Sequence, residues 1–287
     1  MPPSPGRPIR PGSRSLSPGL RRMRVRRWSG IRTGDAAFDD VAREEPLELR
    51  VNGQPVAVIM RTPGNDEELA AGFLLTEGVI RRREDLFSTR HNPRNHDGNV
   101  LEVFLADGVR VDLARLTRHV FGASSCGLCG KATIKAIRTR FPPVRSALRL
   151  TAETLLSMPD RLRQGQSLFG RTGGLHAAGL FEADGSLVDL SEDVGRHNAV
   201  DKLLGRALLN DRLPLDTTLL LVSGRVSFEI VQKALAAGIP VVAAVGAPSS
   251  LAVEFARSAG QSLVGFLRDG RFNLYTDRRR ITARLPS

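Results

Sequence analysis

The last third of the chain alternates short apolar runs with amphipathic segments, and this order restricts the fold more than any other feature. Apolar runs at 217–222, 241–245 and 263–267 have the length of buried strands. Helical spacing of apolar residues occupies the two intervals between them, at 227–237 and 250–259. Because a strand–helix–strand–helix–strand order normally produces parallel strands joined by right-handed crossovers, this segment predicts an α/β domain.

We expect the α/β domain to span residues 118–287 and a smaller α+β domain to precede it at 35–117. A chain of 287 residues is long enough for both. In the smaller domain, alternating apolar and polar residues on both sides of Asn52-Gly53 predict a β-hairpin. Helical spacing predicts a helix over 67–77, and a second hairpin is expected across Asp107-Gly108.

The first 34 residues differ in composition from the rest. They hold nine arginines and no acidic residue, which accounts for nine of the twelve net positive charges. They are also rich in Pro, Ser and Gly, which do not build a core, so we expect a disordered basic tail at 1–34. Such a tail can bind nucleic acid weakly and without sequence preference, but we expect a solvated tail and no specific nucleic-acid partner. Its purpose stays open.

The chain carries no signal for a membrane or for export. No apolar run reaches the roughly 18 residues of a membrane span, so no membrane partner is expected. No apolar stretch follows Arg21-Arg22, as a secretory signal would require. Two cysteines do not make a disulfide framework, so we expect a reducing, cytoplasmic location.

Both cysteines of the chain stand in one short motif, with Cys126 and Cys129 separated by Gly127-Leu128. A disulfide between them would close a very small loop and would restrain the unfolded chain little, so a chemical role is favoured over a stabilising one. We expect a helix to begin at 132, and its N-terminus together with Lys131 would favour the thiolate. The residues allow a redox dithiol, half of a metal site or a nucleophilic sulfur carrier.

Two of these uses find little support in the rest of the sequence. Zinc needs about four ligands, and no second CxxC is present. His119, His176 and His197 match no known ligand spacing, so we expect no metal site. A thioredoxin-like motif requires a strand directly before the cysteines, and 120–123 is a weak strand.

The loops after the predicted parallel strands are candidates for ligand binding. Ser223-Gly224-Arg225 and the segment containing Ser249 each lie between the end of a strand and the start of a helix. Open α/β sheets bind ligands at this edge, where free N–H groups suit phosphate. Arg225 is able to make a bidentate contact with phosphate or guanine. The turn at 268–271 is placed to close over the same ligand.

The segment 192–202 is dense in polar groups. Asp201 and either His197 or Asn198 fall near one helical face, at spacings of three and four. A charge-rich surface helix held by salt bridges is the structural alternative. His176 follows a tight glycine turn, and a single histidine is more often a hydrogen-bonded core residue. The roles of His176, His197 and Asp201 stay open.

Several segments, in the same order along the chain, resemble the FdhD family of formate dehydrogenase accessory sulfurtransferases. The resemblance runs from about residue 46 to 277 and leaves out the tail. The segments that carry it are Arg61-Thr62-Pro63-Gly64, Leu69-Ala70-Ala71-Gly72-Phe73-Leu74, Ser125-Cys126-Gly127-Leu128-Cys129-Gly130, Thr172-Gly173-Gly174-Leu175-His176-Ala177-Ala178, Glu192–Lys202 and Ala247-Pro248-Ser249-Ser250-Leu251-Ala252.

The resemblance implies a cytoplasmic, dimeric sulfur carrier whose larger domain is a cytidine-deaminase-like, three-layer α/β domain. A cysteine desulfurase would pass sulfur to the CxxC, with Cys126 holding the persulfide and Cys129 assisting. The sulfur would go to a molybdenum bis(molybdopterin guanine dinucleotide) cofactor bound as cargo, which then enters formate dehydrogenase. The family's cofactor segment matches Phe266-Leu267-Arg268-Asp269-Gly270-Arg271. Molybdenum versus tungsten, and the formate dehydrogenase served, stay open.

Two other functions fit the residues. A non-catalytic chaperone would use the phosphate-suited loops to dock the cofactor and would not need Cys126. A thiol–disulfide oxidoreductase would cycle a disulfide between Cys126 and Cys129.

Overall fold

The computed structural model describes residues 18–93, 95, 98–111 and 141–283. The CxxC, the strand expected at 120–123 and the helix expected from 132 lie outside the described residues, as do His119 and residues 1–17.

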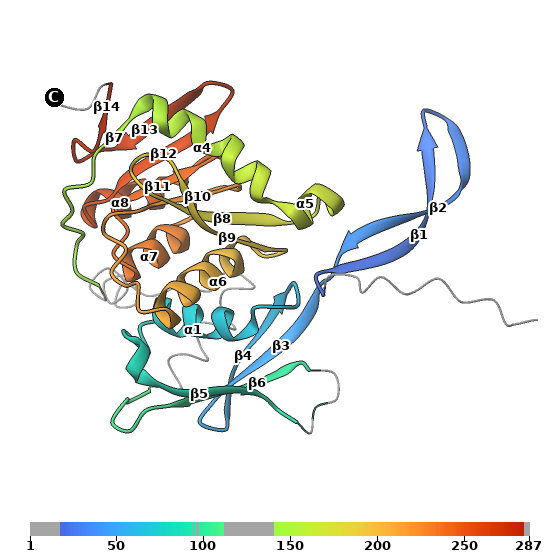
Figure 1. Ribbon diagram of the computed structural model, residues 1–287, viewed down its shortest axis with the longest axis horizontal. Coiled ribbons are helices and arrows are strands. Elements are labelled where there is room, and N and C mark those ends of the chain that lie inside the picture. The colour runs from blue at the N-terminus through green and yellow to red at the C-terminus, as the bar shows by residue number, and fades with distance from the viewer. Residues whose placement is uncertain (1–17, 94, 96–97, 112–140, 284–287) are drawn as a thin grey trace, which may run out of the picture.

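A six-stranded mixed sheet forms the centre of the larger unit, in the order β13-β12-β11-β10-β8-β9 (Figure 1). Its strands are β8 (His176–Phe181), β9 (Leu187–Asp193), β10 (Leu219–Val222), β11 (Val241–Ala244), β12 (Ser262–Arg268) and β13 (Arg271–Thr276). The strands β10, β11 and β12 are parallel, and helices α7 (Phe228–Ala236) and α8 (Ser250–Ser258) connect them. The predicted α/β alternation is therefore confirmed. Antiparallel strands extend the sheet on both sides.

Helices cover both faces of this sheet. Figure 1 shows α4 (Ala152–Gly165) above the sheet, with α6 (Arg196–Leu209) and α7 below it. On the α4 side, Leu155 and Met158 are fully buried and share a cluster with Phe181. The other side has a separate and larger cluster, because alternate residues of each strand face opposite ways. The result is the expected three-layer arrangement.

The smaller unit is a four-stranded sheet in the order β4-β3-β6-β5. Its elements are β3 (Glu45–Val51), β4 (Gln54–Arg61), α1 (Asp66–Thr76), the short 3₁₀ helix η1 (Arg83–Asp85), β5 (Leu86–His91) and β6 (Val100–Leu105). The hairpin across Asn52-Gly53 and the helix after it are confirmed. The hairpin expected across Asp107-Gly108 is wrong, because β6 pairs with β5 and β3 and residues 109–111 form no strand.

Helix α1 joins the two units through α6. One hydrophobic cluster contains Leu49 and Leu74 from the smaller unit and Leu203 from the larger, so the described parts share a core. The helices meet at two glycines: a Cβ on Gly72 would lie 1.8 Å from the carbonyl oxygen of Asp201, and one on Gly205 would lie 1.8 Å from that of Glu68. Only glycine permits this backbone contact. The domain boundary between residues 117 and 118 falls outside the described residues and stays a prediction.

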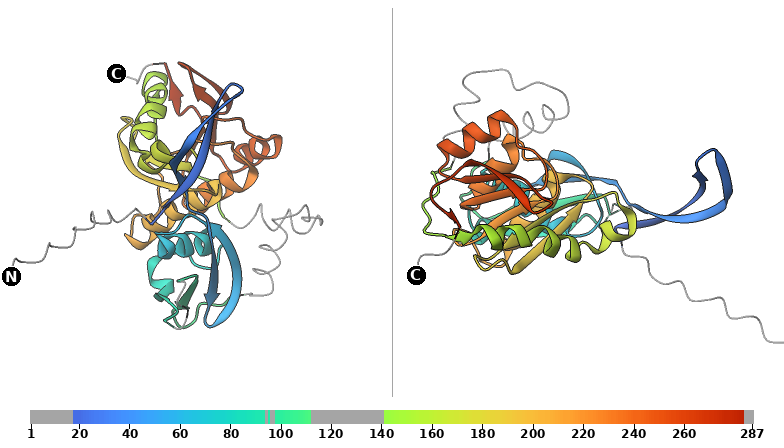
Figure 2. Two further views of the ribbon diagram at one scale, coloured as in Figure 1. Left: turned by 90° about the vertical axis from the view of Figure 1, so that its right-hand side faces the viewer. Right: turned by 90° about the horizontal axis from the view of Figure 1, so that it is seen from above.

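The expectation of disorder is wrong for residues 20–34. Strands β1 (Leu20–Ser29) and β2 (Arg32–Ala42) form an antiparallel ribbon that extends from the body of the molecule, as Figures 1 and 2 show. Backbone pairing forms this ribbon without a core, which composition does not reveal. Gly30 supplies the positive φ of the turn, Leu20 is buried at the base, and Arg171 forms a 2.6 Å ion pair with Asp40.

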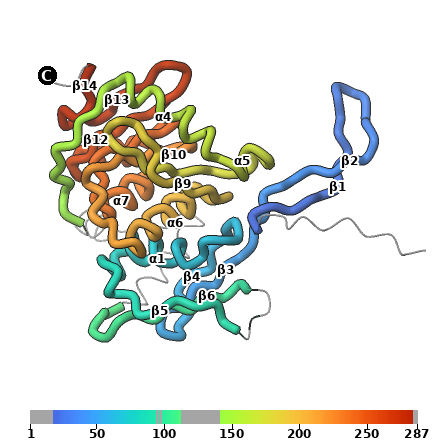
Figure 3. Tube along the Cα trace, viewed as in Figure 1, coloured from blue at the N-terminus to red at the C-terminus, as the bar shows by residue number. Residues whose placement is uncertain are grey.

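The remaining elements are short. Helix α5 (Ser167–Thr172) follows α4, and β7 (Leu150–Thr151) pairs in parallel with β14 (Ile281–Thr282). Figure 3 traces the path of the chain through both units. Among the described residues, no helix is both long enough and apolar enough to span a membrane.

Candidate functional site

Three loops lie side by side where the parallel strands end. The amide of Gly246, after β11, donates to the carbonyl of Gly224, after β10, at 3.1 Å. The amide of Phe266, near the end of β12, donates to the carbonyl of Gly246 at 3.0 Å. The structure therefore brings the predicted segment Ser223–Arg225 next to the start of the predicted segment at 266, at the sheet edge where α/β proteins bind ligands.

The two predicted serines have structural hydrogen bonds at this edge. The Ser223 hydroxyl accepts from the amide of Ala177 at 2.9 Å and so continues the pairing of β8 with β10. The Ser249 hydroxyl accepts from the amide of Ala252 at 3.2 Å and caps helix α8. Each hydroxyl therefore already accepts a backbone hydrogen bond that stabilises the local structure.

The segment 266–271 forms the end of β12, a turn and the start of β13. Leu267 is fully buried in the core, so its side chain holds the sheet and does not reach solvent. Phe266 and Asp269 both have a φ of 53°, in the left-handed region. Arg268, Asp269, Gly270 and Arg271 are exposed. These residues line the outer part of the edge.

His176 and Arg196 also reach this edge, from strand β8 and from the start of helix α6. A Cβ on Gly224 would lie 3.3 Å from His176 Nδ1 and 3.9 Å from Arg196 Cδ, so both side chains approach the bare backbone of that glycine. Burial lowers the pKa of His176 from its ordinary value of 6.5, and the charges of Arg196 and Arg225 lower it further, against a smaller opposing effect of Asp193.

His197, the next residue of α6, is a neutral imidazole at physiological pH. Burial lowers its pKa to about 4, with further contributions from Lys233 and Arg196. Its Nε2 lies 3.2 Å from the Ser227 hydroxyl and 3.9 Å from a Glu229 carboxylate oxygen. Both partners meet the same ring nitrogen, so this is not a serine–histidine–acid triad, in which the acid and the serine use different nitrogens.

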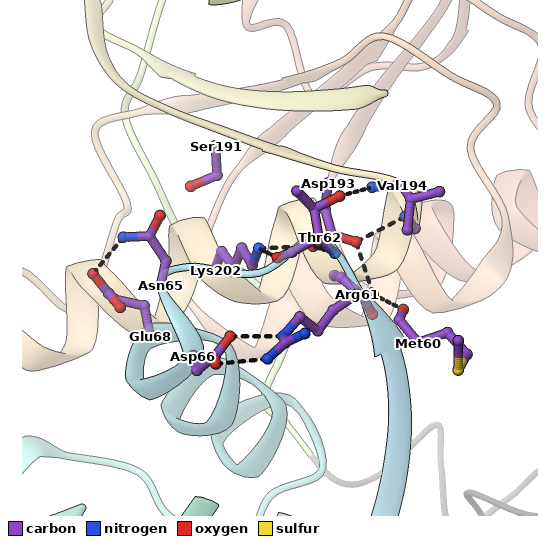
Figure 4. A network of polar contacts seen from close by, with 12 residues as sticks. Met60, Arg61, Thr62, Asn65, Asp66, Glu68, Ser191, Asp193, Val194 and Lys202 are labelled. Atoms are coloured by element: carbon purple, nitrogen blue, oxygen red, sulfur yellow. Dashed lines mark hydrogen bonds and ion pairs between the residues drawn. The ribbon is translucent and has the colours of Figure 1, made fainter. Parts of the chain in front are cut away.

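Most of the polar run at 192–202 is structural. Asp193 is fully buried, and its Oδ2 lies 2.7 Å from Lys202 Nζ and 3.0 Å from the amide of Thr62 (Figure 4). Lys202 also donates to the carbonyl of Thr62 at 2.7 Å, and Asn198 donates to Asp193 Oδ1 at 2.9 Å. These contacts fasten the end of β9 and the start of α6 to the segment after β4.

A second buried pair fixes the side of α6 that faces α7. Both carboxylate oxygens of Asp201 lie 2.8 Å from Lys233 Nζ, and Thr76 donates to Asp201 at 3.0 Å. Asp201 therefore connects α1, α6 and α7 and has a structural role. A third pair, between Arg61 and Asp66, is bidentate at 2.9 and 3.0 Å and orders the entry into α1 (Figure 4).

The sequence did not single out Arg196, Ser227 or Glu229 as site residues. Arg196 stands within the polar run at 192–202, and the density of polar groups there is the sequence pattern that could have indicated it as a site residue. Within the described part of the chain, no group of three or more His, Cys, Asp or Glu side chains is arranged to hold a metal ion. Cys126 and Cys129 lie outside that part, so their placement relative to this edge stays a prediction.

Comparison with known proteins places the chain in a family. The sequence profile of the FdhD/NarQ family matches residues 42–282. A curated relative from Streptomyces coelicolor, named sulfur carrier protein FdhD, is 55% identical over 88% of this chain and 94% of its own length. Proteins of the same name from Mycobacterium tuberculosis and Saccharolobus solfataricus are 53% and 42% identical, over 85% and 90% of this chain and 92% and 99% of their own lengths.

A solved structure supports the same assignment. The crystal structure of a candidate formate dehydrogenase accessory protein from Desulfotalea psychrophila superposes with a TM-score of 0.73 at 26% identity. The match covers 92% of this chain and all of the other. The profile, the curated relatives and the fold agree, and the chain belongs to the FdhD/NarQ family.

Proposed function

We propose that the protein is a sulfur carrier that takes sulfur from a cysteine desulfurase and delivers it to a molybdenum bis(molybdopterin guanine dinucleotide) cofactor destined for formate dehydrogenase. The observation that carries the proposal is the identity of 55% with a protein named as a sulfur carrier, across 88% of the chain. The sequence supplies a fitting nucleophile, because its only cysteines form one CxxC. We place the carrier in the cytoplasm and expect it to act as a homodimer.

The loading step is an exchange between sulfur atoms. The Cys126 thiolate attacks the outer sulfur of a persulfide on the desulfurase, a new S–S bond forms at Cys126, and the donor leaves as a thiolate. The product is a persulfide on Cys126, with no net oxidation or reduction.

The delivery step requires two electrons, because the transferred sulfur leaves as sulfide. The Cys129 thiolate supplies them by attacking the inner sulfur of the Cys126 persulfide. A disulfide forms between the two cysteines, and hydrosulfide leaves to become a ligand of the metal in the cargo. A cellular thiol reductant then returns the disulfide to the dithiol.

The described edge of the sheet supports the part of the proposal that concerns the cargo. A guanine dinucleotide carries phosphates, and Arg196 and Arg225 place positive charge beside the bare backbone of Gly224. The predicted cofactor segment at 266–271 begins near Gly224, because the amide of Phe266 donates to Gly246 and the amide of Gly246 donates to Gly224. We propose Ser223–Arg225, Ser249 and the exposed residues of 266–271 as the cofactor-binding surface.

Intact-mass analysis tests the sulfur-carrying step. The reduced protein is incubated with a cysteine desulfurase and cysteine, and wild type is expected to gain the mass of one or more sulfur atoms. Cys126→Ser is expected to gain none. Cys129→Ser serves as the matched control: it should still load Cys126 and should hold the adduct longer, because delivery uses Cys129. No gain in folded wild type, or an equal gain in Cys126→Ser, contradicts the proposal.

The same variants separate the two alternatives. A non-catalytic chaperone requires that Cys126→Ala still activates formate dehydrogenase. An oxidoreductase requires catalytic turnover of a disulfide substrate by wild type and its loss in either cysteine variant. We expect an inactive Cys126→Ala that still binds the cofactor, and no such turnover.

A further inference from the structure

The β1–β2 ribbon leaves the body of the molecule, and neither of its two edges pairs with another strand of the described part (Figures 1 and 2). At its base, Leu20 is buried and the amide of Arg43 donates to the carbonyl of Gly19 at 2.9 Å. Asp40 of β2 forms an ion pair with Arg171 of helix α5. The base therefore fixes the ribbon to the body, and the outer edge of β1 is left without a neighbouring strand.

The two faces of the ribbon differ, because successive side chains of a strand point to opposite faces. Arg22, Arg24 and Arg26 share one face with the residues of β2 that pair with them, and we call this the arginine face. Met23 and Val25 lie on the opposite face, and Met23 is 43% exposed. One face is therefore cationic, and the other is apolar along its middle.

The positive charge of the arginine face is not balanced within the described residues. Its three arginines are exposed and make no ion pair there. The acidic residue across from the first of them, Asp40, is already paired with Arg171. Asp39 lies on the opposite face, where it pairs with Arg27 at 3.6 Å. The arginine face is thus able to attract an external anion.

A further strand with carboxylates at alternate positions would complement this face. Side chains on one face are two residues apart in every strand, so alternate carboxylates of an added strand come opposite successive arginines. The residues between the carboxylates would be apolar, because they lie beside Met23 and Val25. The unpaired N–H and C=O groups at the edge of β1 would supply the backbone hydrogen bonds.

Neither the described part of this chain nor a second copy of it offers such a strand. Residues 1–17 have arginine as their only charged side chain. The edge strands β4, β5 and β13 contain no acidic residue. Edge strand β9 has three, but Asp189 is paired with Arg206, Glu192 accepts from two backbone amides, and Asp193 is buried. The complementary strand has to come from another protein.

Nucleic acid is the other polyanion that arginines attract. However, β2 places Asp35, Asp39 and Asp40 in the same ribbon, where their charges repel phosphate groups. The exposed rings of Trp28 and Phe38, beside several arginines, are side chains that are enriched at protein interfaces. The residues of the ribbon therefore favour a protein partner.

We propose that the β1–β2 ribbon is a docking arm that binds an acidic, extended segment of a partner protein along the edge of β1. Carboxylates at alternate positions of that segment pair with the arginine face, and the apolar residues between them cover Met23 and Val25. The docking arm is defined by the ribbon alone and does not depend on the proposed function.

The one tryptophan of the chain reports on the ribbon. Trp28 lies in β1 and is 66% exposed, so the tryptophan fluorescence of the full chain comes from this element. The probe is a peptide of alternating Glu and Val with the length of β1. Its binding is expected to shift the emission to shorter wavelength, to protect Trp28 from quenching by acrylamide, and to weaken as salt is added. A peptide of alternating Lys and Val is the control and should not bind.

Three double variants test which arginines bind the peptide. Arg22→Gln with Arg24→Gln is expected to weaken binding roughly fivefold, the effect of losing two exposed ion pairs of ordinary strength. Arg212→Gln with Arg257→Gln removes the same charge from exposed positions outside the ribbon and should bind like wild type. Arg22→Lys with Arg24→Lys keeps the charge of the arginine face and should also bind like wild type.

Each alternative partner gives its own result. Equal binding of the two peptides, or wild-type affinity in the Arg22→Gln, Arg24→Gln variant, overturns the docking arm. A single-stranded oligouridylate that binds more tightly than the Glu/Val peptide at the same salt concentration makes the ribbon a nucleic-acid arm and also overturns it. Loss of self-association in the same variant, measured by sedimentation, assigns the ribbon to a contact between copies, with the same consequence. Sulfur loading of Cys126 is measured separately, so its failure refutes the proposed function and leaves the docking arm in place.

Discussion

Gly72 lies where helix α1 crosses helix α6, and replacing it with alanine is expected to destabilise the protein. The added Cβ would lie 1.8 Å from the carbonyl oxygen of Asp201 and 2.6 Å from its carbonyl carbon. Carbon–oxygen contacts of this kind are about 3.3 Å or longer, so the two backbones would have to separate by about 1.5 Å. The obstacle is backbone and has no rotamer that could move aside.

The expected cost follows from two opposing effects. Overpacking a core typically costs about 1–3 kcal/mol, and we take the upper end because both helices must move. Alanine is favoured over glycine inside a helix by about 1 kcal/mol, which offsets part of this cost. The net loss is about 2 kcal/mol. With an unfolding entropy of about 2.1 cal/mol/K per residue, this lowers the melting temperature of a 287-residue chain by about 3 °C.

Thermal and urea unfolding monitored by circular dichroism measure the effect. Gly170→Ala is the matched control, because Gly170 lies inside α5 and a Cβ there meets no described atom within 4 Å. That variant is expected to gain up to about 1 kcal/mol from helix propensity alone. If Gly72→Ala melts at or above the wild-type temperature, as Gly170→Ala should, the helices do not meet as closely as the structure has them.

Three further predictions concern other described residues. Lys202→Met leaves the Asp193 carboxylate buried without its cation and is expected to cost about 3–5 kcal/mol in urea unfolding; a loss under about 1 kcal/mol would contradict the buried pair. Ser249→Ala removes the N-cap of α8 and is expected to lower the free energy of unfolding by about 1 kcal/mol in the same assay. An unchanged free energy of unfolding would contradict the capping role. His197 binds no proton in the folded chain between pH 6.5 and about 4, whereas the unfolded chain does, so stability should fall as the pH drops through that window. His197→Gln should flatten this dependence between pH 7 and 5, and an equal slope in both proteins would refute the depressed pKa.

The fold of the last third could be predicted because its signal is local. Strands such as β10 and β11 are continuous apolar runs between turn residues, and each helix between them has its own apolar stripe. Strand β5 was missed because Leu86 is its one buried residue, which leaves no alternating pattern. The β1–β2 ribbon was missed because five of the ten residues of β1 are arginine. That composition favoured a disordered tail over a strand.

The meeting of the candidate loops could be predicted where it follows from the order of the parallel strands β10, β11 and β12. It was missed where it depends on pairing between strands that are distant in the sequence. Ser223–Arg225 and Phe266 meet because carboxyl ends of parallel strands share an edge. Arg196 joins them only because β8 and β9 add to the sheet beside β10, which no local pattern encodes. In the run at 192–202, Asp201 and either His197 or Asn198 were expected near one helical face. His197 and Asp201 do both meet helix α7, His197 at its N-cap Ser227 and Asp201 at Lys233, whereas Asn198 bonds to Asp193.

The shared core of the two units has a consequence during synthesis. Helix α1 ends at Thr76 and α6 begins at Arg196, so α1 is translated about 120 residues before the helix it packs against. At about 5–20 residues per second, the nascent chain exposes the α6-facing side of α1 for roughly 6–25 s. The ribosome therefore presents an apolar helix well before its partner exists. We expect binding by chaperones that act on nascent chains to be strongest in this interval and to end once α6 has emerged.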